Sequence, residues 1–408
     1  MISVEKAIHL VLKNVSPLLP TKVPMENALG RVSAETVKAR FDLPRFASSA
    51  MDGFALRNAD TLAASYRKPV QLTLQAKTIF AGQHSSRKLQ PKTAVRIMTG
   101  APLPKGANSV LPQEEVRVNK GKLFLEVPVA SGANVRPSGE DCQKGDRILR
   151  PGTFIDPMAI GFLSALGIKR IAIHRPPRVA IIITGNEVRP IGTIRLPKGA
   201  VYDSHSSFLT AALCEFGLRP VSITYVRDRS DLICTKMKRS LQQADLILVT
   251  GGVSVGERDF VRPVAKSLGV KTVFWSVAQK PGKPIFFGRK RSRFVFGLPG
   301  NPAATVVCYL EYVRPALRRM LGFFECAPVA VPARLVQPIS VNGSRTTFLR
   351  AHLFARKKNW YANPAGRQGS HLLRSFVTSN CLVIIPTNLH NKNRKQLANA
   401  HPYPWRTI

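Results

Sequence analysis

The chain has 408 residues, and its 61 Lys and Arg against 23 Asp and Glu give a formal net charge of +38. This length predicts three or four domains, and a hydrophobic content of 44% excludes an intrinsically disordered protein. No apolar run approaches the roughly 18 residues that a transmembrane helix needs. Six scattered cysteines favour a reducing cytoplasm over a zinc site or a disulfide framework.

The first part of the chain predicts a helix followed by a β-rich region. The N-terminal residues carry an apolar stripe at helical spacing, which is typical of an amphipathic helix and not of a signal peptide: Val4, Ala7, Ile8, Val11, Leu12 and Val15. Residues 40–140 then hold short β-like runs broken by Gly and Pro, such as 70–74, 93–98 and 123–127. These runs indicate a small β-rich domain.

Residues 178–321 alternate between strand and helix patterns, which predicts a doubly wound, mainly parallel sheet. The expected strands are Val179–Thr184, Val221–Val226, Asp245–Thr250, Val270–Trp275 and Val295–Leu298. The expected helices are Ser204–Phe216 (with Asp203 or Ser204 as N-cap), Ser230–Gln243, Phe260–Leu268 and Pro302–Leu321. The basic cluster Arg289–Arg293 separates two apolar runs and predicts a solvated hairpin turn.

The last part of the chain is again β-like, with strands expected at 329–336, 347–353 and 381–385. No acid follows Glu325, so the last 83 residues hold twelve Lys and Arg without a balancing charge. This asymmetry fits either a face that binds a polyanion or an organism whose proteins are generally basic. We favour the second, because the basic residues are dispersed.

Acidic residues follow several of the predicted parallel strands. Glu187, Asp228, Glu257 and Asp259 each come just after a strand ends. Because the carboxyl ends of parallel strands meet at one sheet edge, these acids are expected to converge on one crevice. Carboxylates there favour a hard cation such as Mg²⁺.

A glycine-rich loop lies at the same edge. Thr250, Gly251, Gly252 and Ser254 follow a buried strand, and their amides and hydroxyls suit a phosphate with a metal beside it. A tight strand-to-helix turn would also require these glycines.

Two further segments suggest anion binding. Lys280 and Lys283 flank a Pro-Gly turn and could clamp an oxyanion, although a solvated turn has the same composition. The segment 298–302, Leu-Pro-Gly-Asn-Pro, opens a helix whose N-terminus favours anions, or it is a plain helix cap. Ser204 and His205 are adjacent, but no nucleophilic triad can be identified.

Taken in order, the motifs resemble those of the molybdopterin molybdotransferases, bacterial relatives of the C-terminal domain of gephyrin. The resemblance covers nearly the whole chain. The matching stretches are PRFASSAMDGFA at 44–55, RIMTGAPLPKGAN at 96–108, GED at 139–141, TGNEV at 184–188, YDSHS at 202–206, TGGVSVG at 250–256, PGKP at 281–284 and LPGNP at 298–302.

The resemblance implies a cytoplasmic homodimer of four-domain subunits. It assigns 20–39 with 145–168 to a small discontinuous domain I, and 40–144 to a β-rich domain II. It assigns 1–19 with 169–326 to the α/β molybdopterin-binding domain III, and 327–408 to a C-terminal β-barrel, domain IV. Further implied partners are the molybdopterin adenylyltransferase and molybdoenzyme apoproteins or chaperones.

The implied activity is the last step of molybdenum cofactor synthesis, in which adenylylated molybdopterin is cleaved with Mg²⁺, molybdate enters the dithiolene and AMP leaves. The resemblance implies catalytic roles for Asp52, Asp141, Glu187, Asp228 and Asp259, with Mg²⁺ held among the last three. The substrate-binding residues that it implies are Thr99, Ser204, Thr250, Gly251, Gly252, Ser254, Lys280, Lys283, Pro299, Pro302, Arg350 and Ser370.

The chain departs from the family pattern at several positions. Family members often have Asp at Asn186, Asn at His205 and Asp-Tyr at Glu257-Arg258, and they end in a different final strand. Three alternatives stay open: an adenylyltransferase on the same sheet, a molybdopterin-binding scaffold without catalysis, and a nucleic-acid-binding module. The last rests on charge alone, because no basic stripe is interleaved with aromatic residues. Neither a specific nucleic acid nor a membrane is therefore an expected partner.

Overall fold

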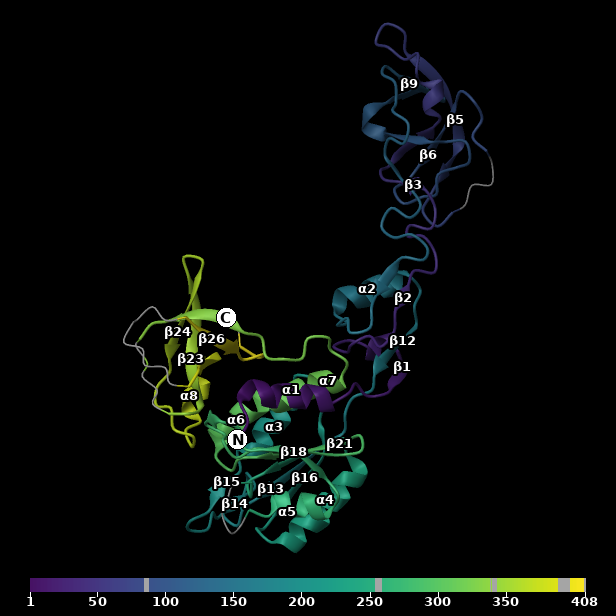
Figure 1. Cartoon of the computed structure of the whole chain (residues 1–408). Coiled ribbons are helices and arrows are strands. Elements are labelled where there is room, and N and C mark those ends of the chain that lie inside the picture. Colours follow the sequence, from purple (N-terminus) through teal and green to yellow (C-terminus); the bar gives the residue numbers. More distant parts are fainter. Residues whose placement is uncertain (84–87, 254–258, 338, 340–342, 388–396, 407–408) are drawn as a thin grey trace. The chain divides into compact units, whose positions relative to one another are not determined.

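The computed structural model describes residues 1–83, 88–253, 259–337, 339, 343–387 and 397–406 (Figure 1). The chain forms two compact units. One comprises Met1–Glu35, Pro151–Ile160 and Arg170–Ile408, and the other Thr36–Arg150 and Gly161–Lys169. The finer four-domain boundaries stay a prediction.

A six-stranded sheet in the order β16-β13-β17-β21-β20-β18 forms the centre of the first unit. Its strands are β13 Val179–Thr184, β16 Pro220–Val226, β17 Leu246–Thr250, β18 Lys271–Trp275, β20 Phe286–Lys290 and β21 Arg293–Leu298. β16, β13, β17 and β21 are parallel neighbours, whereas β20 runs antiparallel to both of its neighbours. Every residue of β13 and β17 is buried, as expected for central parallel strands.

Helices cover both faces of this sheet, which confirms the doubly wound architecture (Figure 1). One face packs against α1 Val4–Asn14, α3 His205–Cys214, α6 Pro302–Cys308 and α7 Arg314–Met320. The other packs against α4 Ser230–Gln243 and α5 Val261–Ser267. Alternate residues of β13 point to opposite faces of the sheet. Ile181 and Ile183 pack in the core on the α1 side, and Ala180 and Ile182 pack in the core on the α4 side.

The structure corrects one predicted helix, and it confirms the predicted hairpin turn and Asp203 as the cap of α3. The helix expected over Pro302–Leu321 contains a π-helical segment, Tyr309–Val313, between α6 and α7. The basic cluster at 289–293 does form a hairpin turn, with Arg291 at φ 55° between β20 and β21. Ser204 makes no side-chain capping bond; the carboxylate of Asp203 caps α3 by accepting from the amides of His205 and Ser206 at 2.8 and 3.2 Å.

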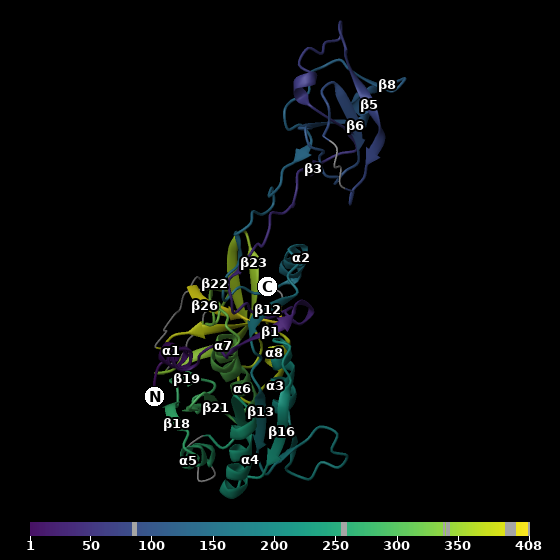
Figure 2. The same cartoon turned by 90° about the vertical axis from the view of Figure 1, so that its right-hand side faces the viewer.

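The C-terminal strands close into a five-stranded barrel, since β23-β24-β22-β26-β25 is joined into a ring by the pairing of β23 with β25. Three of its strands, β22, β23 and β26, are labelled in Figure 2. The strands are β22 Val331–Leu335, β23 Thr346–Arg356, β24 Asn359–Pro364, β25 Cys381–Ile385 and β26 Leu397–Pro402, with α8 Arg374–Val377 between β24 and β25. A short strand from the α/β region, β19 Gln279–Lys280, pairs in parallel with β23. This pairing ties the lysine turn to the barrel.

The first unit also contains smaller elements: β1 Pro20–Pro24, which pairs with β12 Arg170–His174, the 3₁₀ turn Met25–Asn27, and β14 Val188–Arg189, which pairs with β15 Val201–Tyr202. The helix α2 Pro157–Ala165, which the sequence analysis did not predict, contributes residues to both units.

The second unit is β-rich, as predicted. Its main sheet has the order β7-β4-β6-β5-β9-β8, with β4 Gly53–Leu56, β5 Val70–Ile79, β6 Thr93–Ile97, β7 Ser109–Pro112, β8 Arg117–Asn119 and β9 Lys122–Leu125. Two short pairs accompany it: β2 Val37–Lys38 with β11 Arg147–Leu149, and β3 Ser48–Ser49 with β10 Val135–Arg136. Single 3₁₀ turns lie at Asn58–Asp60 and Gln113–Glu115.

In the described parts of both units, no helix has the length and hydropathy needed to span a membrane.

A buried ion pair holds the start of β17. Asp245 is 5% exposed and accepts bonds of 2.8 Å from both terminal nitrogens of Arg175 and from the amide of Arg178. Burial raises the pKa of this carboxyl, but the hydrogen bonds from Arg175 and Arg178 outweigh burial, and the net pKa is lowered. Stability from this group is therefore present above the unfolded-state pKa of about 3.9 and is lost as pH falls through the folded pKa.

We expect Asp245→Asn to lower the free energy of unfolding at pH 7 by about 2 kcal/mol, since it removes charge-assisted hydrogen bonds from a buried site. The variant should also lose less stability than the wild type between about pH 5 and pH 3. Urea unfolding across this pH range measures both effects. The control is Asp231→Asn, whose exposed pair with Arg229 should contribute little. Equal stability of the two variants would remove Asp245 from this role.

Candidate functional site

The candidate site begins at the carboxyl edge of the α/β sheet. The neighbouring strands end in register, with Thr184 beside Val226 and Thr250 beside Leu298. The loops that follow these four strands therefore start at one sheet edge. These loops carry most of the residues that the sequence analysis assigned to the metal and the phosphate.

Asp228 and Asn186 join two of these loops. The amide of Asn186 donates to Oδ2 of Asp228, and the amide of Asp228 donates to Oδ1 of Asn186, both at 3.3 Å. This reciprocal pair fixes the loop after β13 against the loop after β16. Glu187 is exposed and follows Asn186 on the loop after β13. Asp259 is half-buried and lies just before α5. Ser254 and Glu257 lie outside the described residues.

The glycine loop approaches its neighbours closely. Gly251 has φ 82°, and a Cβ there would lie 2.6 Å from the hydroxyl of Thr184, so a larger residue is excluded by conformation and by space. Its amide donates to the Leu298 carbonyl at 3.0 Å, and the carbonyl of Gly252 accepts from Val261 at 3.1 Å. The buried hydroxyl of Thr250 has no hydrogen-bond partner among the described residues. A polar ligand at this loop would satisfy it.

The carboxylates at this edge would suit Mg²⁺ that is held together with a substrate phosphate. No group of three potential metal ligands occurs among the described residues. Mg²⁺ does not require one, because it commonly keeps several waters and is held by one or two carboxylates together with substrate phosphates. Asp228 and Asp259 supply such carboxylates at the edge where the glycine loop could receive a phosphate.

A cleft of about 810 Å³ opens between the α/β region and the barrel. Four predicted substrate-binding residues meet in its wall: Lys280, Lys283, Pro299 and Ser370. Arg345 adds a third cationic side chain, and no carboxylate belongs to the described lining. A wall of this charge attracts anions. The sequence analysis did not predict that Arg345, Asn301 and Gln368 line this cleft. Of these three, only Asn301 lies in a motif identified there, the segment 298–302.

Ser370 connects the barrel to the start of α6. Its carbonyl accepts from the amide of Ala303 at 3.1 Å, and its hydroxyl accepts from the side-chain amide of Asn301 at 3.2 Å. Pro302 occupies the first turn of the helix, where its missing amide hydrogen costs nothing. The cleft wall is therefore built from segments of the α/β region and the barrel that are hydrogen-bonded to each other.

Arg350 lies beneath the barrel side of the cleft. Its side chain is fully buried, and it donates to the hydroxyl of Ser375 at 3.0 Å and to the carbonyls of Arg367 and Gly369 at 3.2 and 3.1 Å. Burial lowers the pKa of this guanidinium. Arg350 thus supports the loop that carries Ser370, and its predicted direct contact with substrate stays a prediction.

Comparisons with known proteins agree over most of the chain. Three family models match: "MoeA N-terminal region (domain I and II)" over residues 2–167, "Probable molybdopterin binding domain" over 180–319 and "MoeA C-terminal region (domain IV)" over 332–393. The molybdopterin molybdenumtransferase of Haemophilus influenzae is 31% identical over 93% of both chains. The chain belongs to the molybdopterin molybdenumtransferase family.

Further relatives support this assignment. The molybdopterin molybdenumtransferase of Staphylococcus aureus is 29% identical over 94% of this chain and 91% of its own. A crystal structure of the molybdopterin biosynthesis MoeA protein from Pyrococcus horikoshii superposes with a TM-score of 0.86 at 30% identity, covering 98% of this chain and 99% of that one. A crystal structure of a molybdopterin biosynthesis MoeA protein from Pyrococcus horikoshii OT3 gives a TM-score of 0.82 at 29% identity, covering 99% of this chain and 100% of that one. The resemblance in the motifs is thereby confirmed.

The β-rich unit of this family member holds three more of the predicted residues. Asp52 accepts from the hydroxyl of Thr99 at 2.6 Å and from its amide at 2.7 Å, and these bonds lower the pKa of the Asp52 carboxyl. Asp52 is therefore held as an ionised, oriented acceptor. Asp141 is exposed, and its amide donates to the Leu43 carbonyl at 3.0 Å.

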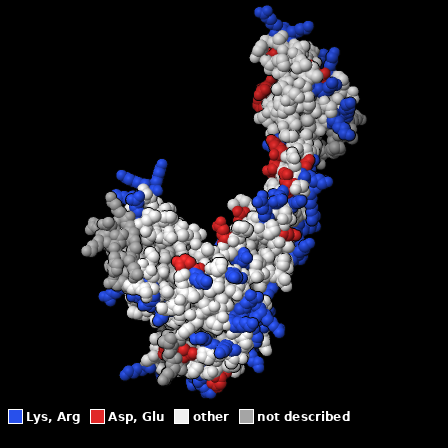
Figure 3. Space-filling view, in the orientation of Figure 1, with Lys and Arg blue, Asp and Glu red and all other residues white. Residues whose placement is uncertain are grey.

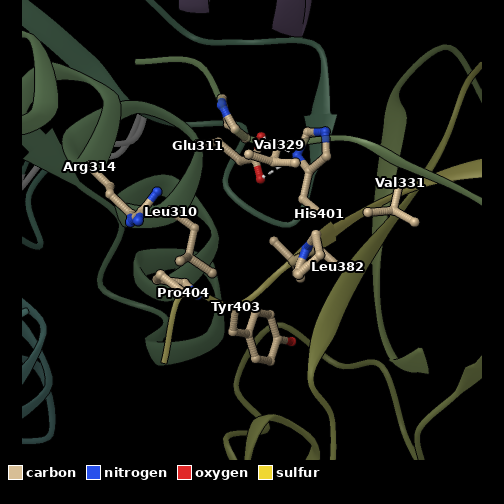
Figure 4. A pocket seen from close by; sticks show the side chains of 11 residues that line it. Leu310, Glu311, Arg314, Val329, Val331, Leu382, His401, Tyr403 and Pro404 are labelled. Atoms are coloured by element: carbon tan, nitrogen blue, oxygen red, sulfur yellow. Dashed lines mark hydrogen bonds and ion pairs between the residues drawn. The ribbon is translucent and has the colours of Figure 1, made fainter. Parts of the chain in front are cut away.

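A smaller pocket of about 260 Å³ lies elsewhere in the first unit and contains none of the predicted residues (Figure 4). In it, the fully buried Glu311 of the π-helical segment faces His401 of β26, with Nδ1 3.0 Å from Oε1. Leu310, Leu382 and Tyr403 also line this pocket. This contact joins the barrel to the helix layer of the α/β region, so we interpret it as structural.

Proposed function

We propose that this family member is the transferase that completes the molybdenum cofactor. It would bind adenylylated molybdopterin, cleave the phosphoanhydride with Mg²⁺, place molybdate in the dithiolene and release AMP. The observation that carries the proposal is the cationic cleft, where Lys280, Lys283, Pro299 and Ser370 meet at one wall. The names of the relatives support the same reaction class.

The chemistry of the step matches the residues available. Phosphoanhydride cleavage requires neutralisation of charge on the phosphate oxygens. When bound, Mg²⁺ supplies part of this neutralisation, and Asp228 and Asp259 are the residues proposed to hold it. Lys280 and Lys283 would hold the anionic substrate groups by charge-assisted hydrogen bonds. The amide of Gly252 would donate to a phosphate oxygen.

Protein thiols are not needed for this reaction, because the sulfurs that receive molybdenum belong to the pterin. Two buried cysteines fit this view. Burial raises the pKa of Cys308 well above its usual range and the pKa of Cys381 to about 12, so both stay protonated at neutral pH. Asp52, in contrast, is ionised and could bind a cation during the reaction.

The proposed reaction can be tested with purified protein, adenylylated molybdopterin, Mg²⁺ and molybdate. The proposal predicts that AMP appears and that molybdenum becomes bound to the pterin. A parallel reaction with molybdopterin and ATP distinguishes the preceding step. Consumption of ATP in that reaction, without cleavage of the adenylylated pterin, would contradict the proposal.

We propose that the working form is a homodimer in which both subunits contribute to each site. Chains carrying Asp52→Ala should then recover part of their activity when mixed and re-associated with chains carrying Asp259→Asn. Light scattering at micromolar concentration measures the mass, and AMP release measures complementation. A fully active monomer would contradict this proposal.

The strong positive charge should assist anion capture without specifying a nucleic acid. Lys and Arg occur at many separate places on the face in Figure 3, and not as one stripe. We expect added NaCl to lower kcat/KM for the adenylylated pterin before kcat falls, because screening weakens long-range attraction first. DNA retained in a gel should be released over the same range. Sequence-selective DNA binding at roughly 0.2 M salt would overturn this expectation.

A further inference from the structure

The loop that carries Lys280 and Lys283 is held from beneath by a buried polar network. Gln279 is fully buried at the start of this loop, and its side-chain nitrogen donates to the Pro281 carbonyl at 3.0 Å. Its side-chain oxygen accepts from the hydroxyl of Tyr312, which is also fully buried. The same nitrogen lies 3.8 Å from the sulfur of Cys308. The network reaches from the helix layer to the backbone between the two lysines.

The contacts of the Gln279 side-chain amide allow only one placement of its nitrogen and oxygen. The Pro281 carbonyl can only accept, so the nitrogen must face it and the oxygen must face Tyr312. Burial raises the pKa of Tyr312 well above its usual range, so its phenol remains a donor at all working pH values. The amide is thus fixed at both ends.

The turn itself fits tightly over this amide. Gly282 has φ 90°, and a Cβ there would lie 2.7 Å from both the Gln279 nitrogen and the Cys308 sulfur. Pro281 and Gly282 are buried, whereas Lys280 and Lys283 are exposed to the cleft. Movement of the amide would therefore shift the backbone that presents both lysines.

Stability alone does not account for this network. Tyr312 and Cys308 belong to the large apolar core of the α/β region. A buried polar pair in such a core can be replaced by apolar groups of similar shape at little cost, whereas removal of one partner is expensive. The pair does, however, provide a directional bond to the loop, which apolar side chains could not supply.

We propose that Gln279 and Tyr312 are positioning residues, which hold the Lys280–Lys283 turn in its anion-binding conformation. This inference rests on the proposed role of the two lysines in binding an oxyanion. Tyr312 orients the amide of Gln279, and the amide holds the Pro281 carbonyl. Neither side chain needs to touch the reacting atoms.

The experiment compares Tyr312→Phe, Gln279→Met and the double variant Gln279→Met/Tyr312→Phe with the wild type. Tyr312→Phe should lose stability, because it leaves the buried Gln279 oxygen without a donor. The double variant should recover stability, since both partners are then apolar. Its KM for molybdate should nevertheless stay raised by about tenfold, the equivalent of roughly one hydrogen bond of 1.4 kcal/mol, with kcat changed less.

Tyr309→Phe is the matched control. Tyr309 is fully buried in the same core, but its hydroxyl donates to the Ala212 carbonyl, away from the lysine turn. This variant should lose stability without a change in KM for molybdate. If the double variant regained both stability and molybdate affinity, the pair would be purely structural and the inference would be wrong.

A second measurement separates this inference from the proposed function. Amide hydrogen exchange of residues 277–283 should be faster in the double variant than in the wild type, and unchanged in Tyr309→Phe. Molybdate binding that is insensitive to Lys280→Ala/Lys283→Ala would contradict the anion-binding role of the lysines. Unchanged exchange in the double variant would instead overturn the positioning role itself.

Discussion

Asp259→Asn and Asp228→Ala are each expected to reduce the rate of AMP release at least about a hundredfold, by analogy with the loss of one preorganised electrostatic group. Both residues follow strands that end at one sheet edge, where their carboxylates are proposed to hold the metal. Quenched-flow or coupled assays of AMP at saturating substrate would measure the rate. Circular dichroism and urea unfolding should show that both variants remain folded.

The control for this pair is Asp231→Asn, in the first turn of α4 and three residues from Asp228. Asp231 pairs with Arg229 at 2.7 Å on the exposed surface, so its loss changes the net charge equally without touching the proposed site. Its activity should remain close to that of the wild type. Normal turnover in Asp228→Ala or Asp259→Asn would remove that residue from the mechanism.

Replacement of both lysines at the cleft should have a comparably large effect. We expect Lys280→Ala/Lys283→Ala to lower kcat/KM roughly a hundredfold or more, since a hydrogen bond to a charged group contributes about 1.5–3 kcal/mol and each 1.4 kcal/mol is a factor of about ten. The measured quantities are kcat/KM for the adenylylated pterin and for molybdate.

Net charge must be matched in this comparison, because a chain of +38 attracts anions as a whole. Lys271→Ala/Lys290→Ala removes two charges from β18 and β20, outside the cleft lining. This control should show only a small, salt-dependent change. If both double variants lost activity equally, the effect would be one of general charge, and the anion clamp would be rejected.

The α/β region could be predicted closely because its signals are local. β13 is a continuous aliphatic run, and α4 has an amphipathic pattern between clear turns, so their observed bounds match the expected ones. The parallel topology then places the loops after the strands at one edge without further information. The position of Asp228 beside Asn186 follows from this rule.

The cleft could not be predicted in the same way, because it depends on long-range pairing. Arg345 reaches it only because β19 pairs with β23, and this pairing joins Gln279 to Thr346, 67 residues further along the chain. Gln279 stands next to a lysine in a turn-like sequence, yet it is fully buried against Tyr312. Similarly, nothing local in the sequence shows that Thr99 would bind Asp52 across 47 residues.

The most direct test of the central claim is a stoichiometric one. The wild-type protein is incubated with adenylylated molybdopterin, and AMP release and pterin-bound molybdenum are measured with both Mg²⁺ and molybdate, with either one alone, and with neither. We predict one AMP and one bound molybdenum per pterin when both are present, and strongly reduced AMP release without Mg²⁺. An intact adenylylated pterin in the complete mixture, or AMP release without molybdenum transfer, would contradict the account.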